Sequence, residues 1–303
     1  MDFHSLHSDH NYGNMKQHGI SLIIGGDGQL GESIKGYLLN VGEQFIETTR
    51  RKKSISSTRL FLDLSKNIEF WNPPDGVSVV YLCAAMTSIE CCARDPIQSE
   101  LINVHNTLEV AKKCIEKDIF VVFPSTNLVF DGTKPFQKID DSVSPKTEYG
   151  RQKAETEKRL LTLNEKIAIV RFTKIISPRM ILINNWMNFL RNKKEINPFS
   201  DMVMSPIPHF LAADLLYRVA SKRLDGIFQL SGVSDITYEK IAYHIADRIG
   251  VERDLIRPIK ALESNILIGH IPQYTTLDST RVIELFNVKI PDSLSAINEV
   301  FKI

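Results

Sequence analysis

The fold is decided by one stretch of sequence, Ile20-Ser21-Leu22-Ile23-Ile24-Gly25-Gly26-Asp27-Gly28-Gln29-Leu30-Gly31. It begins as a short run rich in β-branched residues, which is typical of a buried strand, and it ends in glycines. Leu30, Ile34 and Leu38 follow at helical spacing, so the glycines join a strand to a helix. Strand, glycine turn and helix, in this order, are the context that a dinucleotide-binding loop requires.

The glycine loop satisfies two spacings at once. Gly25, Gly28 and Gly31 form G-x-x-G-x-x-G, and Gly26 in place of Gly25 gives G-x-G-x-x-G. Glycines permit a tight turn and a close approach of the backbone to a pyrophosphate, while the N-terminus of the helix supplies amide donors. We therefore predict a cofactor pyrophosphate held by Gly25, Gly28, Gln29, Leu30 and Gly31. The alternative is a glycine-rich turn without a ligand.

Buried strands alternate with helices through the first part of the chain. The pattern predicts strands over 45–49, 60–64, 77–82, 119–123 and 166–172, and helices over 29–39 and 97–117, with another helix around Tyr149. This alternation favours an α/β fold, a Rossmann-type doubly wound parallel sheet. Right-handed crossovers then bring the carboxyl ends of the strands, and the ligand, to one edge.

The pattern changes after Thr173, where prolines become frequent. We expect a Rossmann domain that binds NADP over residues 19–173, rejoined by about 205–231, because Gly226 to Ser231 looks like a strand that returns to the sheet. Residues 174–204 and 232–303 are expected to form a smaller C-terminal α/β domain that binds substrate. Residues 1–18 hold His4, His7, His10 and His18 and are expected to be a mobile polar leader, with metal binding as the less favoured alternative.

Composition excludes several classes of partner. The 303 residues carry 37 Lys and Arg against 36 Asp and Glu, a formal net charge of +1, so neither nucleic acid nor a membrane surface is an expected partner. No apolar stretch is long enough to span a bilayer, and the N-terminus lacks the apolar core of a signal peptide. The four cysteines show no C-x-x-C spacing and are expected to be small buried hydrophobes rather than redox or metal ligands. We therefore predict a soluble cytoplasmic protein without a metal.

The residues that follow the second strand bear on which cofactor is bound. An acid about 20 residues past the loop would hold a free ribose 2′-hydroxyl. The chain instead reads Thr48-Thr49-Arg50-Arg51-Lys52-Lys53 there, with no carboxylate at the strand end. Because guanidinium groups suit a 2′-phosphate, Arg50 and Arg51 predict a preference for NADP(H) over NAD(H). The alternative is an ordinary basic surface loop. Asp63, near the end of the third predicted strand, is a weaker candidate for contact with the adenine amino group.

Tyr149 and Lys153 lie four residues apart on a predicted helix, so their side chains share a face. A phenol held beside an ammonium is a proton donor with a lowered pKa, which suits the reduction of a carbonyl. The pair alone is weak evidence, since Tyr12 and Lys16 repeat the spacing, and for an isolated pair a solvated helix face is the favoured interpretation. It gains weight from the glycine loop and from Thr126, whose hydroxyl follows a buried strand and is expected at the ligand edge of the sheet.

Three segments carry a resemblance to a known family. They are Ser125-Thr126-Asn127-Leu128-Val129-Phe130-Asp131-Gly132, Pro145-Lys146-Thr147-Glu148-Tyr149-Gly150-Arg151-Gln152-Lys153 and Cys83-Ala84-Ala85-Met86-Thr87-Ser88-Ile89-Glu90. The chain thereby resembles the extended short-chain dehydrogenase/reductases of the NAD-dependent epimerase/dehydratase superfamily, and within them the dTDP-4-dehydrorhamnose reductases. Those enzymes read S-T-D-x-V-F-D-G and then P-x-x-x-Y-G-x-x-K. The resemblance covers most of the chain after about Gly19 and is loose after Phe172.

The resemblance implies a role for each matching residue. Thr126 would hydrogen-bond the substrate oxygen that becomes the alcohol, Tyr149 would protonate that oxygen, and Lys153 would lower the pKa of Tyr149 and hold the nicotinamide ribose. The further cofactor contacts that it implies are Leu64, Ala84, Ala85 and Tyr149 itself. Thr87, which follows the fourth predicted strand, and Asn188, in a region that meets the nucleotide diphosphate in the family, would join Thr126 in binding substrate, and the alternative for each is an ordinary polar surface residue. Asn127 departs from the family pattern, because an amide cannot exchange a proton as the usual aspartate can, and this argues against 4,6-dehydration.

These expectations define three functional hypotheses. The leading one is NADPH-dependent reduction of a nucleotide-linked 4-keto-6-deoxy sugar during the synthesis of polysaccharide precursors. The second is a nucleotide-sugar epimerase that uses the same three catalytic residues. The third is a regulatory subunit that binds NADP without catalysis. The oligomeric state stays open, with a homodimer as the candidate.

Overall fold

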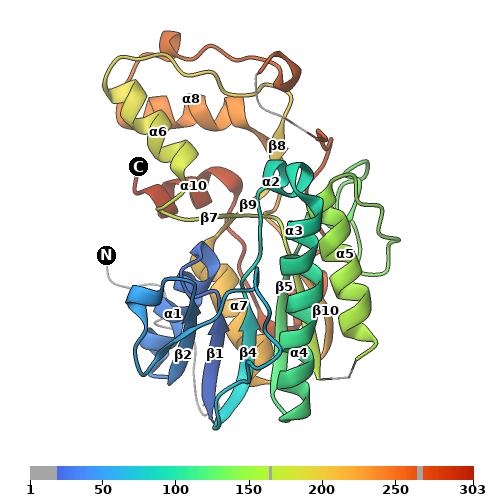
Figure 1. Cartoon of the computed structure of the whole chain (residues 1–303). Helices are drawn as coiled ribbons and strands as arrows, with labels where there is room; N and C mark the ends of the chain where they lie inside the picture. The colour runs from blue at the N-terminus through green and yellow to red at the C-terminus, as the bar shows by residue number, and fades with distance from the viewer. Residues whose placement is uncertain (1–18, 164–165, 265–268) are drawn as a thin grey trace.

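A computed structural model describes residues 19–163, 166–264 and 269–303 of the protein (Figure 1). The predicted leader over residues 1–18, with its four histidines and the Tyr12/Lys16 copy, lies outside the described residues.

Seven parallel strands form one sheet in the order β10-β6-β5-β4-β1-β2-β3. In chain order they are β1 (Ile20–Ile24), β2 (Phe45–Thr49), β3 (Arg59–Phe61), β4 (Val77–Leu82), β5 (Phe120–Thr126), β6 (Ile167–Phe172) and β10 (Gly226–Leu230). The order reverses direction at β1, between β2 and β4, which is the switch point where open α/β sheets bind ligands. The predicted Rossmann-type fold is confirmed, and β10 does rejoin the sheet beside β6.

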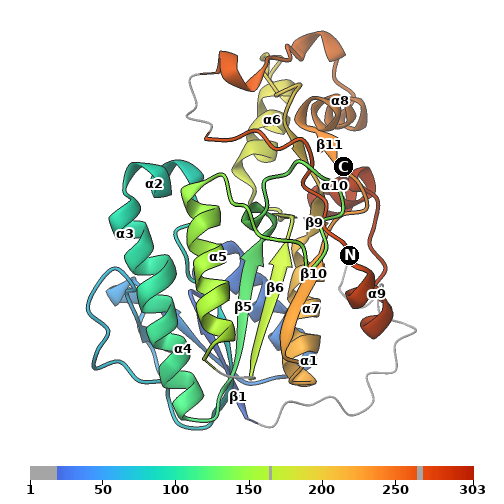
Figure 2. The same cartoon turned by 90° about the vertical axis from the view of Figure 1, so that its right-hand side faces the viewer.

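Helices cover both faces of the sheet (Figures 1 and 2). One face carries α1 (Gln29–Val41), α7 (His209–Ser221) and α9 (Thr280–Phe286), and the other carries α3 (Pro96–Glu100), α4 (Thr107–Glu116) and α5 (Glu148–Leu161). Successive residues of each central strand point to opposite faces, so Val79 and Tyr81 of β4 pack in one core while Val80 and Leu82 pack in the other. A parallel sheet buried on both faces favours strands that are mostly apolar on both sides, and these strands are mostly apolar.

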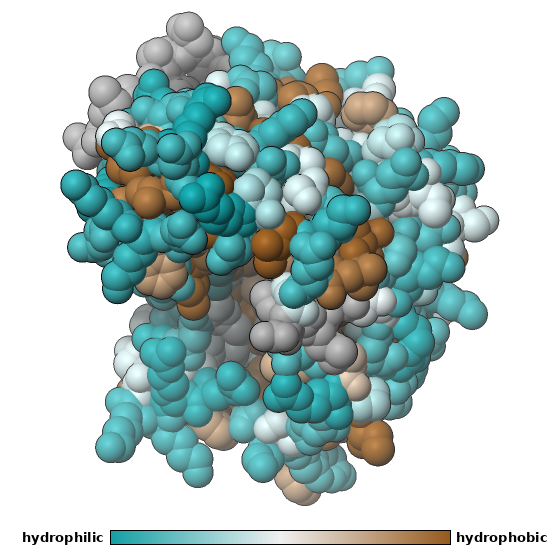
Figure 3. All heavy atoms as spheres, turned by 90° about the horizontal axis from the view of Figure 1, so that it is seen from above, coloured by the Kyte–Doolittle hydropathy of each residue, from teal (hydrophilic) through white to brown (hydrophobic). Residues whose placement is uncertain are grey.

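A separate hydrophobic core lies beyond the carboxyl edge of the sheet, in the upper part of Figure 1. It is built by α6 (Ile181–Arg191), α8 (Tyr238–Ile249) and α10 (Ser293–Phe301). Two small sheets accompany these helices: β7 (Lys174–Ile176) with β9 (Pro206–Pro208), and β8 (Val203–Met204) with β11 (Ile236–Thr237). Ile183, Trp186, Met187 and Leu190 recur on one face of α6, which explains why this helix packs here. Seen from above, this end of the molecule is mostly hydrophilic, and its apolar side chains form small groups (Figure 3).

Three local features differ from the sequence-based expectation. The helix predicted over 97–117 contains a π-helical stretch from Leu101 to Asn106 between α3 and α4. Ser125 and Thr126 belong to the end of β5 rather than to a turn, and the turn itself is a short 3₁₀ helix over Asn127–Val129. All four cysteines are free, but Cys91, on α2 (Ile89–Arg94), is exposed and is not the buried hydrophobe that was expected.

Candidate active site

The glycine loop between β1 and α1 has a geometry that only glycines tolerate. Gly25 has φ +88°, and a Cβ added there would lie 2.8 Å from the backbone nitrogen of Ala84. A Cβ on Gly31 would lie 2.4 Å from the carbonyl oxygen of Gly25, so α1 starts against the loop itself. The N-cap residue, Gly28, offers no side chain to cap the helix. The amides of the first turn of α1 are therefore suited to an anionic ligand.

A cavity of about 530 Å³ extends from this loop along the carboxyl edge of the sheet. Eight of the predicted cofactor residues line it: Gly25, Gly28, Arg50, Arg51, Asp63, Leu64, Ala84 and Ala85. Gln29, Leu30 and Gly31 form the first turn of α1 beside it. The cavity thus joins the glycine loop to the ends of β2, β3 and β4, which is where a Rossmann fold holds an extended dinucleotide.

Asp63 lies at the β3 end of this cavity. Its carboxylate accepts a hydrogen bond of 3.0 Å from the backbone N–H of Ser65. Partial burial works against ionisation, but the hydrogen bonds from Ser65 and the charges of Arg50 and Lys66 outweigh it and lower the pKa of Asp63. The side chain is consequently a charged acceptor, as a contact with an adenine amino group would require.

The end of β2 carries a cluster of charges that the sequence did not reveal. Asp27, from the glycine loop, accepts a hydrogen bond of 2.6 Å from the Thr49 hydroxyl and forms an ion pair with Arg59 of β3. Arg51 is a second cationic neighbour of Asp27, with 4.0 Å between Nε of Arg51 and Oδ2 of Asp27. Burial opposes ionisation of Asp27, but the Thr49 hydrogen bond and the two guanidinium charges lower its pKa. A carboxylate is therefore present at this strand end after all, supplied by the loop.

The predicted catalytic residues come from two neighbouring elements, β5 and α5. Thr126 ends β5, and its hydroxyl accepts a hydrogen bond of 3.2 Å from the Leu128 N–H. A Cβ on Gly150 would lie 2.2 Å from the Leu128 carbonyl oxygen, so the first turn of α5 sits directly on the turn that follows Thr126. Thr147 caps that turn of α5 by accepting a hydrogen bond from the Gly150 N–H. Tyr149, in the same turn, is thereby held beside the carboxyl end of β5.

Lys153 reaches back from α5 to the sheet. Its ammonium donates a hydrogen bond of 2.5 Å to the Pro124 carbonyl oxygen and lies 3.7 Å from the centre of the Phe123 ring. Burial lowers the pKa of Lys153 to about 7, although the nearby Glu157 and Cys83 work in the opposite direction. Because Cys83 lines the cavity, the Lys153 ammonium also lies near the cofactor edge of the sheet.

The electrostatics of Tyr149 differ from the expectation. Burial raises the pKa of the phenol, with a smaller contribution from Cys92, and Lys153 is not among the causes of the shift. The Lys153 ammonium is hydrogen-bonded to the Pro124 carbonyl of β5. The phenol therefore keeps its proton at neutral pH, which a general acid requires.

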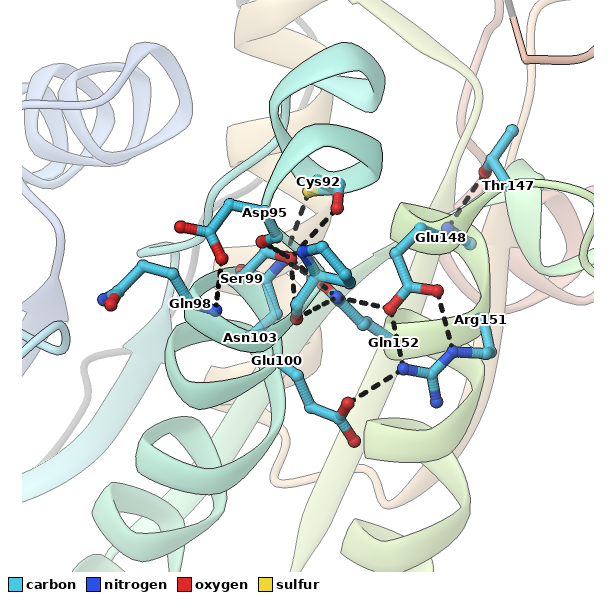
Figure 4. A network of polar contacts seen from close by, with 12 residues as sticks. Cys92, Asp95, Gln98, Ser99, Glu100, Asn103, Thr147, Glu148, Arg151 and Gln152 are labelled. Atoms are coloured by element: carbon cyan, nitrogen blue, oxygen red, sulfur yellow. Dashed lines mark hydrogen bonds and ion pairs between the residues drawn. The ribbon is translucent and has the colours of Figure 1, made fainter.

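A polar network joins α5 to α3 and to the π-helical stretch that follows α3 (Figure 4). The side-chain nitrogen of Gln152 donates to the Ser99 hydroxyl and to Glu148, both at 2.8 Å, and its oxygen accepts a 2.7 Å bond from Asn103. Asn103, in the π-helical stretch, also bonds both the N–H and the carbonyl of Met86. Since Met86 lines the cavity, this network fixes the position of that part of the cavity wall relative to α5, the helix that carries Tyr149.

The remaining predicted residues lie apart from the cavity lining. Thr87 is exposed in the loop after β4, next to Met86. Asn188 is exposed on α6, where its side-chain oxygen accepts a hydrogen bond from Asn192. The side-chain oxygen of Asn127 is 3.5 Å from the Thr126 hydroxyl. The roles of Thr87 and Asn188 in substrate binding stay predictions.

Two further findings concern the described part of the chain. No group of three or more His, Cys, Asp or Glu residues there is arranged to hold a metal ion. Within the same residues, no helix has the length and apolar character needed to traverse a bilayer.

Comparison with known proteins gives a consistent picture. Residues 20–303 match a family model described as the RmlD substrate binding domain. A dTDP-4-dehydrorhamnose reductase of Aggregatibacter actinomycetemcomitans is 23% identical over 293 residues, covering 92% of this chain and 97% of the relative. Subunit beta of methionine adenosyltransferase 2 of Bos taurus is 26% identical over 233 residues, covering 71% of this chain and 69% of the relative.

Among solved structures, the crystal structure of dTDP-4-dehydrorhamnose reductase from Bacillus anthracis in complex with NADP superposes with a TM-score of 0.81. It is 17% identical in sequence, and the match covers 94% of this chain and 99% of that one. At this identity the likeness concerns the fold, and it agrees with the sheet order described above.

Proposed function

The chain belongs to the family described as the RmlD substrate binding domain, and from this premise we propose that it reduces a nucleotide-linked 4-keto-6-deoxy sugar with NADPH, in polysaccharide precursor synthesis. The observation that carries the proposal is the corner where the end of β5 meets the first turn of α5, beside a cavity that starts at the glycine loop. Similarity to a dTDP-4-dehydrorhamnose reductase over almost the whole chain supports the same chemistry.

The proposed reaction divides the work between the cofactor and three side chains. The reduced nicotinamide supplies the hydride that adds to the keto carbon. Tyr149 gives its phenolic proton to the oxygen that would otherwise be left as an alkoxide. Thr126 hydrogen-bonds that oxygen, and Lys153 holds the nicotinamide ribose.

A preference for NADPH over NADH is part of the proposal. Arg50 and Arg51 line the cavity at the end of β2, where the adenosine ribose of a Rossmann cofactor comes to rest. Arg51 is largely exposed and its pairing with Asp27 is loose at 4.0 Å, so its guanidinium can engage a 2′-phosphate.

The test of the function is net oxidation of NADPH, followed at 340 nm, with a panel of nucleotide-linked 4-keto-6-deoxy sugars. We expect stoichiometric oxidation of NADPH with at least one of them and an alcohol at C4 of the product. An epimerase regenerates its cofactor, so isomerisation of a nucleotide sugar without net oxidation would replace the proposal by the epimerase alternative.

A regulatory subunit is the second candidate, favoured by the similarity to subunit beta of methionine adenosyltransferase 2 and by Asn127 in place of the usual aspartate. Such a subunit would bind NADP and a partner enzyme without turnover. Capture of one partner protein in stoichiometric amount, together with no turnover on the sugar panel, would favour this candidate over the reductase.

The pKa of Lys153 yields a prediction about cofactor binding. With a pKa near 7, the amine is mostly neutral at about pH 8, whereas a pyrophosphate and ribose hydroxyls nearby favour the ammonium and raise that pKa. Binding of NADPH at about pH 8 should therefore take up close to one proton, and binding at about pH 6, where Lys153 is already charged, should take up almost none. Calorimetric titration in buffers of different ionisation enthalpy measures this uptake. The Lys153→Met variant should show no such proton uptake. If the variant took up as many protons as the wild-type chain at about pH 8, the role of Lys153 would be contradicted.

Two further expectations remain proposals. Cytoplasmic localisation is supported by the four free cysteines, which a reducing compartment keeps unpaired. A homodimer is a prediction that light scattering of the purified chain would test.

A further inference from the structure

The end of β2 contains an unusual arrangement for a Rossmann fold. The carboxylate that binds the adenosine ribose ordinarily follows β2 itself, about 20 residues after the loop. Here the corresponding strand end is Thr48-Thr49-Arg50, but Asp27 reaches it from the glycine loop and accepts the Thr49 hydroxyl hydrogen bond at 2.6 Å. The acid is therefore present at the ribose end of the cavity, although it comes from a different element.

The groups around Asp27 hold it there as an anion. Arg59 of β3 forms an ion pair with Oδ1, and Arg51 approaches Oδ2 to 4.0 Å. Arg59 also faces Glu47, with 3.5 Å between Nε and Oε1, and Lys35 faces the other oxygen of Glu47 at 3.3 Å. Asp27 and Arg51 line the cavity, so a ligand at the end of β2 meets both charges.

These two charges act oppositely on a 2′-phosphate. Arg51 attracts a group that carries nearly two negative charges, while the nearby Asp27 carboxylate repels it. The free ribose 2′-hydroxyl of NADH, in contrast, can donate a hydrogen bond to the Asp27 carboxylate, as it ordinarily does to an acidic residue that follows β2. We propose that Asp27 is the residue that sets the ratio of NADPH to NADH affinity in this protein, by serving the ribose hydroxyl from the glycine loop and limiting the preference that Arg50 and Arg51 create.

The inference rests on the nicotinamide cofactor of the proposed function, but its test needs no turnover. The dissociation constants of NADPH and NADH are measured by fluorescence titration, and those of 2′,5′-ADP and 5′-AMP by calorimetry. The wild-type chain should bind NADPH no more than about tenfold tighter than NADH, because one carboxylate opposes the arginines. Asp27→Asn keeps the shape and removes the charge, and it should raise the NADPH to NADH affinity ratio by about tenfold, with the same change for 2′,5′-ADP against 5′-AMP.

Asp63→Asn is the matched control, since Asp63 is a second carboxylate lining the same cavity at the end of β3. This variant should weaken the binding of NADPH and of NADH to the same extent and leave the ratio of the two affinities unchanged. Asp27→Ser gives a second neutral variant if Asp27→Asn does not fold, and melting temperatures identify that case. The inference would be overturned if the neutral variant had an unchanged or lowered ratio of NADPH to NADH affinity. It would also be overturned if the wild-type chain bound NADPH more than about a hundredfold tighter than NADH. Absence of binding of either dinucleotide to the wild-type chain would overturn the proposed function as well.

Discussion

Replacement of Tyr149 by phenylalanine is expected to lower kcat for sugar reduction by about a thousandfold, in the middle of the range for loss of a general acid. The variant keeps the ring and loses the hydroxyl, so the alkoxide formed by hydride addition has no adjacent donor. The hydroxyl of Thr126 cannot replace it, because an aliphatic alcohol is a far weaker acid than a phenol. Affinity for NADPH should change by less than about threefold, since the cavity lining contains no part of Tyr149. Steady-state oxidation of NADPH and fluorescence titration measure the two quantities separately.

Tyr243→Phe is a suitable control for this substitution. Tyr243 lies on α8, in the core beyond the sheet edge, where its ring contacts Arg253. Loss of its hydroxyl should leave both kcat and NADPH affinity near their wild-type values. A Tyr149→Phe variant that keeps most of its turnover would show that another group donates the proton.

The second large effect is expected from Gly31→Ala. The new Cβ would lie 2.4 Å from the carbonyl oxygen of Gly25 and 3.0 Å from the Cα of Gly26, and both are backbone atoms that cannot rotate away. The start of α1 must then move off the loop, which misdirects the amides that face the pyrophosphate. We expect the affinity for NADPH to fall by at least about a hundredfold, the loss that several charge-assisted hydrogen bonds entail.

Gly36→Ala in the same helix separates this effect from a general effect on α1. Gly36 is exposed, and an added Cβ there would meet no atom within 4 Å. Alanine should stabilise the helix by about 0.5–1 kcal/mol and leave NADPH binding unchanged. Thermal unfolding and NADPH titration of the two variants give the comparison. If Gly31→Ala bound NADPH as well as Gly36→Ala did, the loop would not be the pyrophosphate site.

The sequence was most informative where local chemistry alone determines structure. The strands at Ile20–Ile24, Phe45–Thr49 and Val77–Leu82 have the predicted bounds, because each is a short apolar or β-branched run that can be buried on both faces. The helix Tyr238–Ile249 likewise has clear local signals at both ends, since Thr237 caps its start and Gly250 ends it with φ +71°. Fold class and the glycine loop follow from such signals.

The sequence was least informative where function depends on residues that folding brings together. Asp27 pairs with Arg59, which lies 32 residues further along the chain, and neither residue stands out in its own segment. The spacing of Tyr149 and Lys153 places them on one helix face, but it does not disclose that the ammonium bonds the Pro124 carbonyl. The π-helical stretch that positions Asn103 has no local signal either, because its sequence is compatible with an ordinary helix.

The central claim is that this chain itself delivers hydride from a nicotinamide to a keto sugar. Incubation with NADPH deuterated at C4 of the nicotinamide, on the transferred face, and a nucleotide-linked 4-keto-6-deoxy sugar tests it by mass spectrometry. We predict one deuterium per product molecule, at C4 of the sugar, and its loss in Tyr149→Phe. Tight binding of the labelled NADPH with no deuterium in any sugar would contradict the claim.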